Sequence, residues 1–193
     1  PLKSGQICDV LVDCVPNMRE GMLPAILEPL EAGIHSGVAS HDSCSKLYHE
    51  IVEIAEKLSL EEDEEEIIAC FEILSEIGRT NPDVFDGGEL FGLINTILDE
   101  LGDLNNEQTI EDAQEMPPLG PIIRFSLELC ILKYVKIDIN QELVKKLVGL
   151  LPLSSQITAM ENIMKLLVDP ILPDKQKFGF LTFDGLFAIT KLL

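Results

Sequence analysis

The feature that most constrains the fold of this chain is the spacing of its apolar residues, which recur every three or four positions along most of the sequence. Two clear stripes are Leu47, Ile51, Ile54, Ala55 and Leu58, and then Ile67, Phe71, Leu74 and Ile77. Such spacing places side chains on one face of an α-helix, and no stretch alternates as a strand would. Leu and Ile dominate and Trp is absent, a balance that also favours helices. The sequence therefore predicts an all-α protein.

Proline, glycine and polar residues divide the periodic segments. The predicted helices cover residues 4–15, 18–34, 43–57, 60–78, 89–102, 121–136, 140–151, 155–169 and 176–192. Successive helix pairs each take about 40 residues, which is typical of stacked helical hairpins. The pattern predicts a right-handed α-solenoid of about four to five hairpins.

Several segments resemble HEAT repeats, namely MLPAILEPLEAGI (22–34), EEEIIACFEILSEIGRTNPDVF (64–85) and ELVKKLVGLLPLSSQITAMENIMKLL (142–167), and FGFLTFDGLFAITKLL (178–193) looks more like an armadillo-type helix pair. The resemblance implies a single helical-repeat domain over 1–193 that binds proteins through an extended surface. Karyopherin-β nuclear transport receptors are one family with this pattern, and chromosome-organising and kinase-scaffold solenoids share it. The chain starts at PLKSG and stops inside an apolar pattern, so we expect a fragment of a longer solenoid.

Charge is distributed unevenly along the chain. Residues 1–120 hold 27 acidic and 5 basic side chains, whereas residues 121–193 hold 7 acidic and 9 basic ones. An acidic half repels polyanions, which argues against direct nucleic-acid binding. The five cysteines include no C-x-x-C pair and suggest reduced thiols, and no signal peptide or long apolar run is present. We expect a cytoplasmic or nuclear protein without membrane insertion.

The longest break in the periodic pattern covers residues 104–121 and is polar, acidic and rich in proline. It is predicted to be an exposed loop between repeats. Glu111, Asp112 and Glu115 form an acidic patch within it.

Six acidic residues in succession run into the helix predicted at 60–78. They are Glu61, Glu62, Asp63, Glu64, Glu65 and Glu66. Ser59 and Glu62 have the spacing of a capping box, in which each side chain accepts from the other residue's backbone N–H. Capping needs only two or three carboxylates, and the surplus suggests a surface that attracts a Lys- or Arg-rich partner segment. The alternative is a solvated edge that serves solubility.

The histidines of the N-terminal half are candidates for zinc ligands or for a Cys–His nucleophile pair. His49 and Glu53 lie in HEIVE, which differs from the zinc-protease pattern H-E-x-x-H by one ligand, and Cys44 has His41 and His49 nearby. No second ligand cluster, orienting acid or phosphate loop accompanies them, and Asp86-Gly87-Gly88 suits a turn that opens a helix. A metal-dependent enzyme around His49 is a remote alternative, and we predict no catalytic residue, metal or cofactor.

The sequence thus favours a non-enzymatic scaffold or adaptor. Its partner would be a basic or amphipathic segment bound at Glu61 to Glu66, with the 104–121 loop as a second patch. A karyopherin-β-like transport segment, or a structural subunit that holds a partner helix in an apolar groove, are the alternatives, and each implies a larger assembly.

Overall fold

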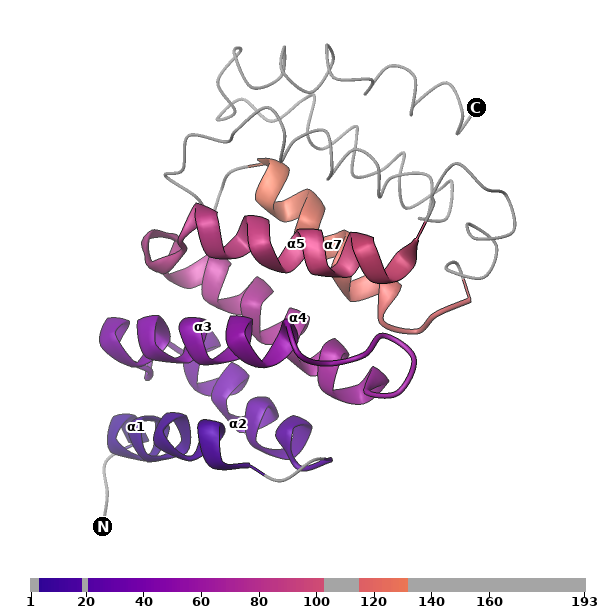
Figure 1. The fold of residues 1–193 in the computed structure, drawn as a ribbon. Coiled ribbons are helices and arrows are strands. Elements are labelled where there is room, and N and C mark those ends of the chain that lie inside the picture. The colour runs from indigo at the N-terminus through magenta and orange to yellow at the C-terminus, as the bar shows by residue number, and fades with distance from the viewer. Residues whose placement is uncertain (1–3, 19–20, 103–114, 132–193) are drawn as a thin grey trace.

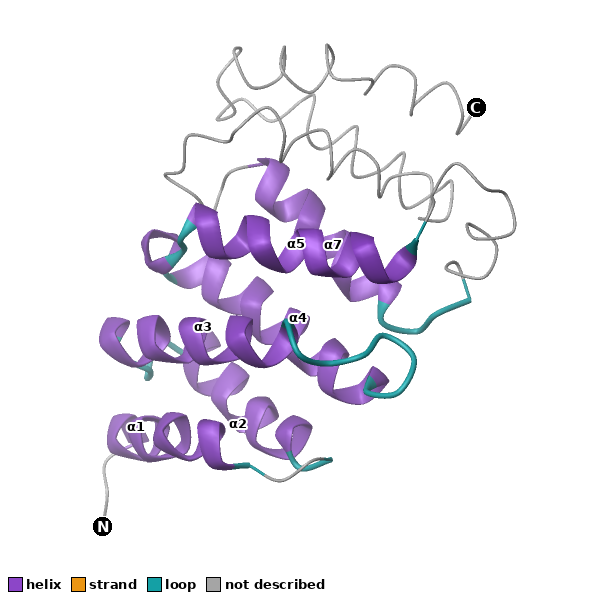
Figure 2. Cartoon of the chain, viewed as in Figure 1, coloured by secondary structure: helices purple, strands orange, loops and turns teal. Residues whose placement is uncertain are grey.

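Every regular element that the structure describes is a helix. The computed structural model describes residues 4–18, 21–102 and 115–131, and within these ranges it contains six α-helices and no strand (Figure 2). The helices are α1 (Ser4–Cys14), α2 (Leu23–His35), α3 (His41–Ala55), α4 (Glu64–Thr80), α5 (Gly87–Leu101) and α7 (Leu119–Ile131), and short 3-10 turns follow α1 (Val15–Asn17) and α4 (Pro82–Val84). The predicted all-α class is confirmed for this part of the chain. The helices predicted at 140–151, 155–169 and 176–192 lie outside the described residues.

The described helices form two layers that alternate along the chain (Figure 1). In one layer α3 packs against α1 and α5, and in the other α4 packs against α2 and α7, while α1–α2 and α3–α4 contacts join the layers. Helices α2 and α4 run parallel. The backbone N–H of Gly21, before α2, donates to Glu66 Oε1 in the first turn of α4 at 2.7 Å, and His35 at the end of α2 lies 3.0 Å from Glu76 Oε1.

Local residues explain where the helices begin. The Ser40 hydroxyl accepts from the Ser43 N–H at 3.1 Å and caps α3. The Asp86 carboxylate accepts from the N–H groups of Gly88 and Glu89 at 2.8 and 3.1 Å, so the Asp-Gly-Gly sequence does open α5. Helix α2 starts at Leu23 rather than at the predicted residue 18, because Gly21 has φ of +77°, outside the helical region.

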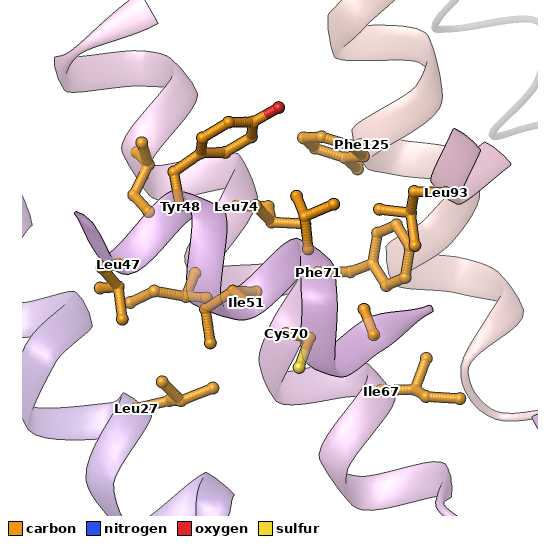
Figure 3. Packing of buried hydrophobic residues seen from close by; sticks show 14 of the residues in the cluster. Leu27, Leu47, Tyr48, Ile51, Ile67, Cys70, Phe71, Leu74, Leu93 and Phe125 are labelled. Atoms are coloured by element: carbon orange, nitrogen blue, oxygen red, sulfur yellow. The ribbon is translucent and has the colours of Figure 1, made fainter. Parts of the chain in front are cut away.

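Helix α4 forms the centre of the core. Ile67, Cys70, Phe71 and the six consecutive residues from Ile73 to Gly78 are buried, so this helix is covered on nearly all sides in its second half. The Phe71 and Phe125 rings meet edge to face with centroids 5.5 Å apart, beside Leu74 and Leu93 (Figure 3). The apolar stripes predicted for α3 and α4 are therefore core.

The buried cysteines fit this core. Cys8, Cys44 and Cys70 are buried free thiols, while Cys14 is exposed. Burial raises the pKa of the Cys70 thiol to about 12, and the nearby Glu66 carboxylate adds to this effect. A thiol of this kind stays protonated and serves packing.

Tyr48 joins α3 to the start of α5 by a reciprocal pair of hydrogen bonds. Its hydroxyl donates to the Asp86 carbonyl and accepts from the Asp86 N–H, each at 3.1 Å, and its ring is fully buried against Phe85. We expect Tyr48→Phe to cost about 1–3 kcal/mol of unfolding free energy, because both backbone groups lose their partner. Urea denaturation measures this. Ser36→Ala removes an exposed bond to Ala32 and is the control, and an equal loss in both variants would contradict the prediction.

Two expectations about loops need correction. The loop predicted at 104–121 ends earlier, because Leu119, Gly120 and Pro121 belong to α7, and residues 103–114 lie outside the described residues. The helix predicted from residue 60 starts at Glu64, and Ser59 is not its N-cap. No helix in the described ranges is both long and apolar enough to cross a membrane.

Candidate partner-binding groove

A groove of about 540 Å³ lies between the parallel helices α2 and α4. Its apolar lining consists of Pro24, Ala25, Leu27, Ile68, Ala69 and Ile73, and its four polar residues are Glu28, Glu31, Glu65 and Glu72. We call this feature the acidic groove.

The helical repeat explains why these residues share one surface. On α2 the lining positions rise from Pro24 through Glu28 to Glu31, and on α4 from Glu65 through Ala69 to Glu72. Steps of three or four residues keep the side chains on one face of each helix. The alanines on both walls are too short to fill the space between the helices, so a groove remains.

The carboxylates of the groove differ in their surroundings. Glu28 and Glu65 are exposed, whereas Glu31 and Glu72 are half-buried. Arg124 of α7 places its Nη2 atom 3.8 Å from Glu72 Oε1. Burial raises the pKa of the Glu31 carboxyl, and the Glu72 and Glu76 carboxylates raise it further, while Arg79 and Arg124 lower it.

Glu76 is a buried carboxylate next to this groove. Its side chain is 4% exposed. Glu76 Oε1 lies 3.0 Å from His35 Nδ1, and Glu76 Oε2 accepts a hydrogen bond from Arg79 Nη1 at 2.8 Å. Both oxygens are thus engaged, which satisfies a buried charge. Glu76 therefore holds α2 to α4 rather than offering a free binding group.

The structure separates the six residues of the predicted acidic run. Glu61 and Glu62 are exposed in the turn before α4, and Glu64 starts the helix. The Asp63 carboxylate accepts from the Ser59 N–H at 2.9 Å. The Glu66 carboxylate accepts from the Gly21 N–H. Glu65 is the member that lines the acidic groove. The six residues therefore do not form one surface. Some are exposed in the turn or at the helix start, Asp63 and Glu66 accept hydrogen bonds from backbone N–H groups, and Glu65 lines the groove.

The capping box predicted for Ser59 and Glu62 is wrong. The Ser59 hydroxyl accepts from the backbone N–H of Glu61 at 3.3 Å, not from that of Glu62. The Ser59 N–H donates to the Asp63 carboxylate, not to that of Glu62. Leu60 is buried and its N–H donates to Glu100 Oε1 of α5 at 2.7 Å. Packing against α5 holds residues 59–63 in a turn, which delays the helix until Glu64.

The second predicted patch is described only at Glu115, which is exposed in the turn before α7. Glu111 and Asp112 lie outside the described residues. Sequence reasoning missed Glu28, Glu31 and Glu72. Their signal was present in the helical spacing of Glu28 with Glu31 and of Glu65 with Glu72, but it did not show that the two helices meet.

The histidines contact carboxylates of the following hairpin. His49 Nδ1 lies 2.9 Å from Glu89 Oε2, and His41 Nε2 lies 3.1 Å from Asp83 Oδ2. Within the described ranges, no group of three or more His, Cys, Asp or Glu side chains is arranged to hold a metal ion. His49 thus has a role in joining α3 to α5.

Comparison with known proteins adds no relative. No protein-family model matches the sequence, and neither the curated proteins nor the solved structures yield a match.

Proposed function

We propose that this chain is a non-enzymatic protein-binding scaffold or adaptor, and that the acidic groove binds a partner segment with basic and apolar side chains. The observation that carries this proposal is the combination of an apolar lining with four glutamates in one groove. Apolar contact supplies binding free energy, and the carboxylates attract and select a cationic segment. The excess of acidic residues in 1–120 adds a long-range attraction of the same sign.

We further propose a right-handed α-solenoid of HEAT or armadillo type, with about four to five hairpins, as the architecture behind this function. Support comes from polar contacts that join residues a similar distance apart in sequence. His35 and Glu76 are separated by 41 residues, Tyr48 and Asp86 by 38, and His49 and Glu89 by 40. Offsets of about 40 residues are typical of stacked helical hairpins. The offset is 33 between Asp13 and Lys46 and 52 between Glu72 and Arg124, so the described hairpins differ in length. A karyopherin-β-like segment that works in the cytoplasm or nucleus is one form of this proposal.

The apolar lining also favours a second candidate, a structural subunit that holds a partner helix without help from charge. Ionic strength separates the two. The screening length falls from about 10 Å at 0.1 M salt to about 3 Å at 1 M, so only the electrostatic form of binding weakens strongly over this range.

The test compares two variants with the same change in net charge. The groove variant carries Glu28→Gln, Glu31→Gln, Glu65→Gln and Glu72→Gln, and the turn variant carries Glu61→Gln, Glu62→Gln, Glu64→Gln and Glu115→Gln. We expect capture of partners from cell extract, quantified by mass spectrometry, to fall about ten-fold or more with the groove variant, and to change about three-fold or less with the turn variant.

Salt gives the second readout of the same experiment. Capture by the wild-type chain is expected to weaken between about 0.1 M and 1 M salt. Equal capture by all three proteins would exclude the groove as the binding surface. A partner that is lost with the groove variant but is indifferent to salt would favour the structural subunit.

A further inference from the structure

Glu31 differs from the exposed Glu28 and Glu65 in being half-buried and from Glu72 in having no ion pair in the described ranges, because the nearby cations are engaged by other carboxylates. Arg124 lies next to Glu72, and the Arg79 guanidinium donates to Glu76. Within the described residues, no hydrogen bond or ion pair reaches the Glu31 carboxylate. It is nevertheless half-buried at the groove wall, near two other carboxylates. The free protein therefore holds a charge for which it supplies no direct partner.

Building on the proposed function, we propose that Glu31 selects the partner's charge, by receiving one Lys or Arg side chain between α2 and α4 while an apolar side chain of the same segment covers Ile68 and Ala69. Charge complementarity points to this occupant. The wall of α2 offers Glu31, the opposite wall offers Glu72, and the partly exposed Ile68 and Ala69 of α4 belong to the same lining. A cation placed there relieves the repulsion among the carboxylates and gains a charge-assisted hydrogen bond.

The charged groups around Glu31 decide the sign of its pH dependence. They are Glu28 and His35 on α2, Glu65, Glu72, Glu76 and Arg79 on α4, and Arg124 on α7. Burial and the neighbouring carboxylates raise the Glu31 pKa in the folded protein above its ordinary value. A raised pKa means that Glu31 favours folding at low pH and that this contribution is lost as the pH rises through the folded-state pKa. At neutral pH the ionised Glu31 thus disfavours the free fold and favours the complex.

The probe is an acetylated, amidated Leu–Lys peptide of about 14 residues, with Leu at every third or fourth position, and a twin in which Gln replaces Lys. Fluorescence anisotropy measures binding to the full chain. We expect Glu31→Gln to weaken binding of the Lys peptide about ten-fold or more. Glu61→Gln, which neutralises an exposed glutamate of the turn before α4 outside the groove lining, is the matched control and is expected to change it about three-fold or less.

A thermodynamic cycle isolates the contact. Changing Lys to Gln in the peptide should weaken binding to the wild-type chain strongly and should have a much smaller effect on the Glu31→Gln variant. Affinity for the Lys peptide should also rise as the pH rises through the Glu31 pKa, and this rise should be smaller in Glu31→Gln than in Glu61→Gln.

The free protein provides a readout that a merely structural residue would not give. Glu31→Gln is expected to raise the melting temperature at about pH 7, and this gain is expected to shrink as the pH falls through the Glu31 pKa. If Glu31→Gln binds the peptide as tightly as the wild-type chain while the groove variant does not, the role of Glu31 is wrong and the proposed function stands. If the groove variant also binds as tightly as the wild-type chain, both are wrong.

Discussion

Replacing Phe71 with alanine is expected to lower the free energy of unfolding by about 3–5 kcal/mol. The ring is 1% exposed in the middle of α4 and packs edge to face on Phe125 of α7. Its removal takes away buried apolar surface and leaves a cavity where α4 meets α7, and the surrounding helices cannot close it completely. Urea denaturation followed by circular dichroism measures the loss.

Ile7→Ala provides the control for this experiment. Ile7 lies on α1 and is 46% exposed, so its truncation is expected to change stability by about 0.5 kcal/mol or less. A loss below about 1.5 kcal/mol for Phe71→Ala would show that α7 does not pack on α4 as described.

The second large effect is expected at Gly33, in the last turn of α2. A methyl group on Gly33 would lie 2.6 Å from Cys8 Sγ of α1, closer than two such atoms can pack. We expect Gly33→Ala to destabilise the protein by about 1–3 kcal/mol, although alanine normally stabilises a helix relative to glycine. The same urea titration measures the change.

Removal of the opposing sulfur tests the cause. In the double variant Gly33→Ala with Cys8→Ala, the added methyl group takes the space of the removed thiol, so the two substitutions should be less harmful together than their separate effects predict. Gly120→Ala is the matched helical control, because nothing lies within 4 Å of the added methyl group, and it is expected to be neutral or stabilising. Additive effects of the two substitutions would exclude the proposed contact.

Much of the described fold could be predicted because apolar residues that recur at helical intervals lie on one face of a helix and become buried. Leu47 and Ile51 of α3, and Phe71 and Leu74 of α4, recur at the intervals that place them on one face, and all four are buried. The sequence predicted a helix from residue 89 that the turn Asp86-Gly87-Gly88 opens, and α5 begins two residues earlier, at Gly87, where the Asp86 side chain caps it.

The groove could not be predicted because it depends on contacts between helices. Glu31 and Glu72 are 41 positions apart and come together only when α2 packs on α4. The helix start predicted at residue 60 was wrong for the same reason. The N–H of Leu60 donates to Glu100 of α5, which lies 40 residues away and cannot be recognised as its partner from the sequence. The acidic run attracted attention by its density, yet position in the packed layers decides which carboxylates can act together.

The parallel packing of α2 and α4 gives the acidic groove a direction. Peptide dipoles add along each helix, so both N-terminal ends contribute partial positive charge near Pro24 and Glu65, and both C-terminal ends contribute partial negative charge beyond Glu31 and Glu72. Two antiparallel helices would largely cancel these contributions. The two dipoles by themselves favour the cationic end of a bound segment near Glu31, whereas the carboxylates of Glu61 to Glu66 at the N-terminal end of α4 and the guanidinium groups of Arg79 and Arg124 towards the other end act in the opposite direction.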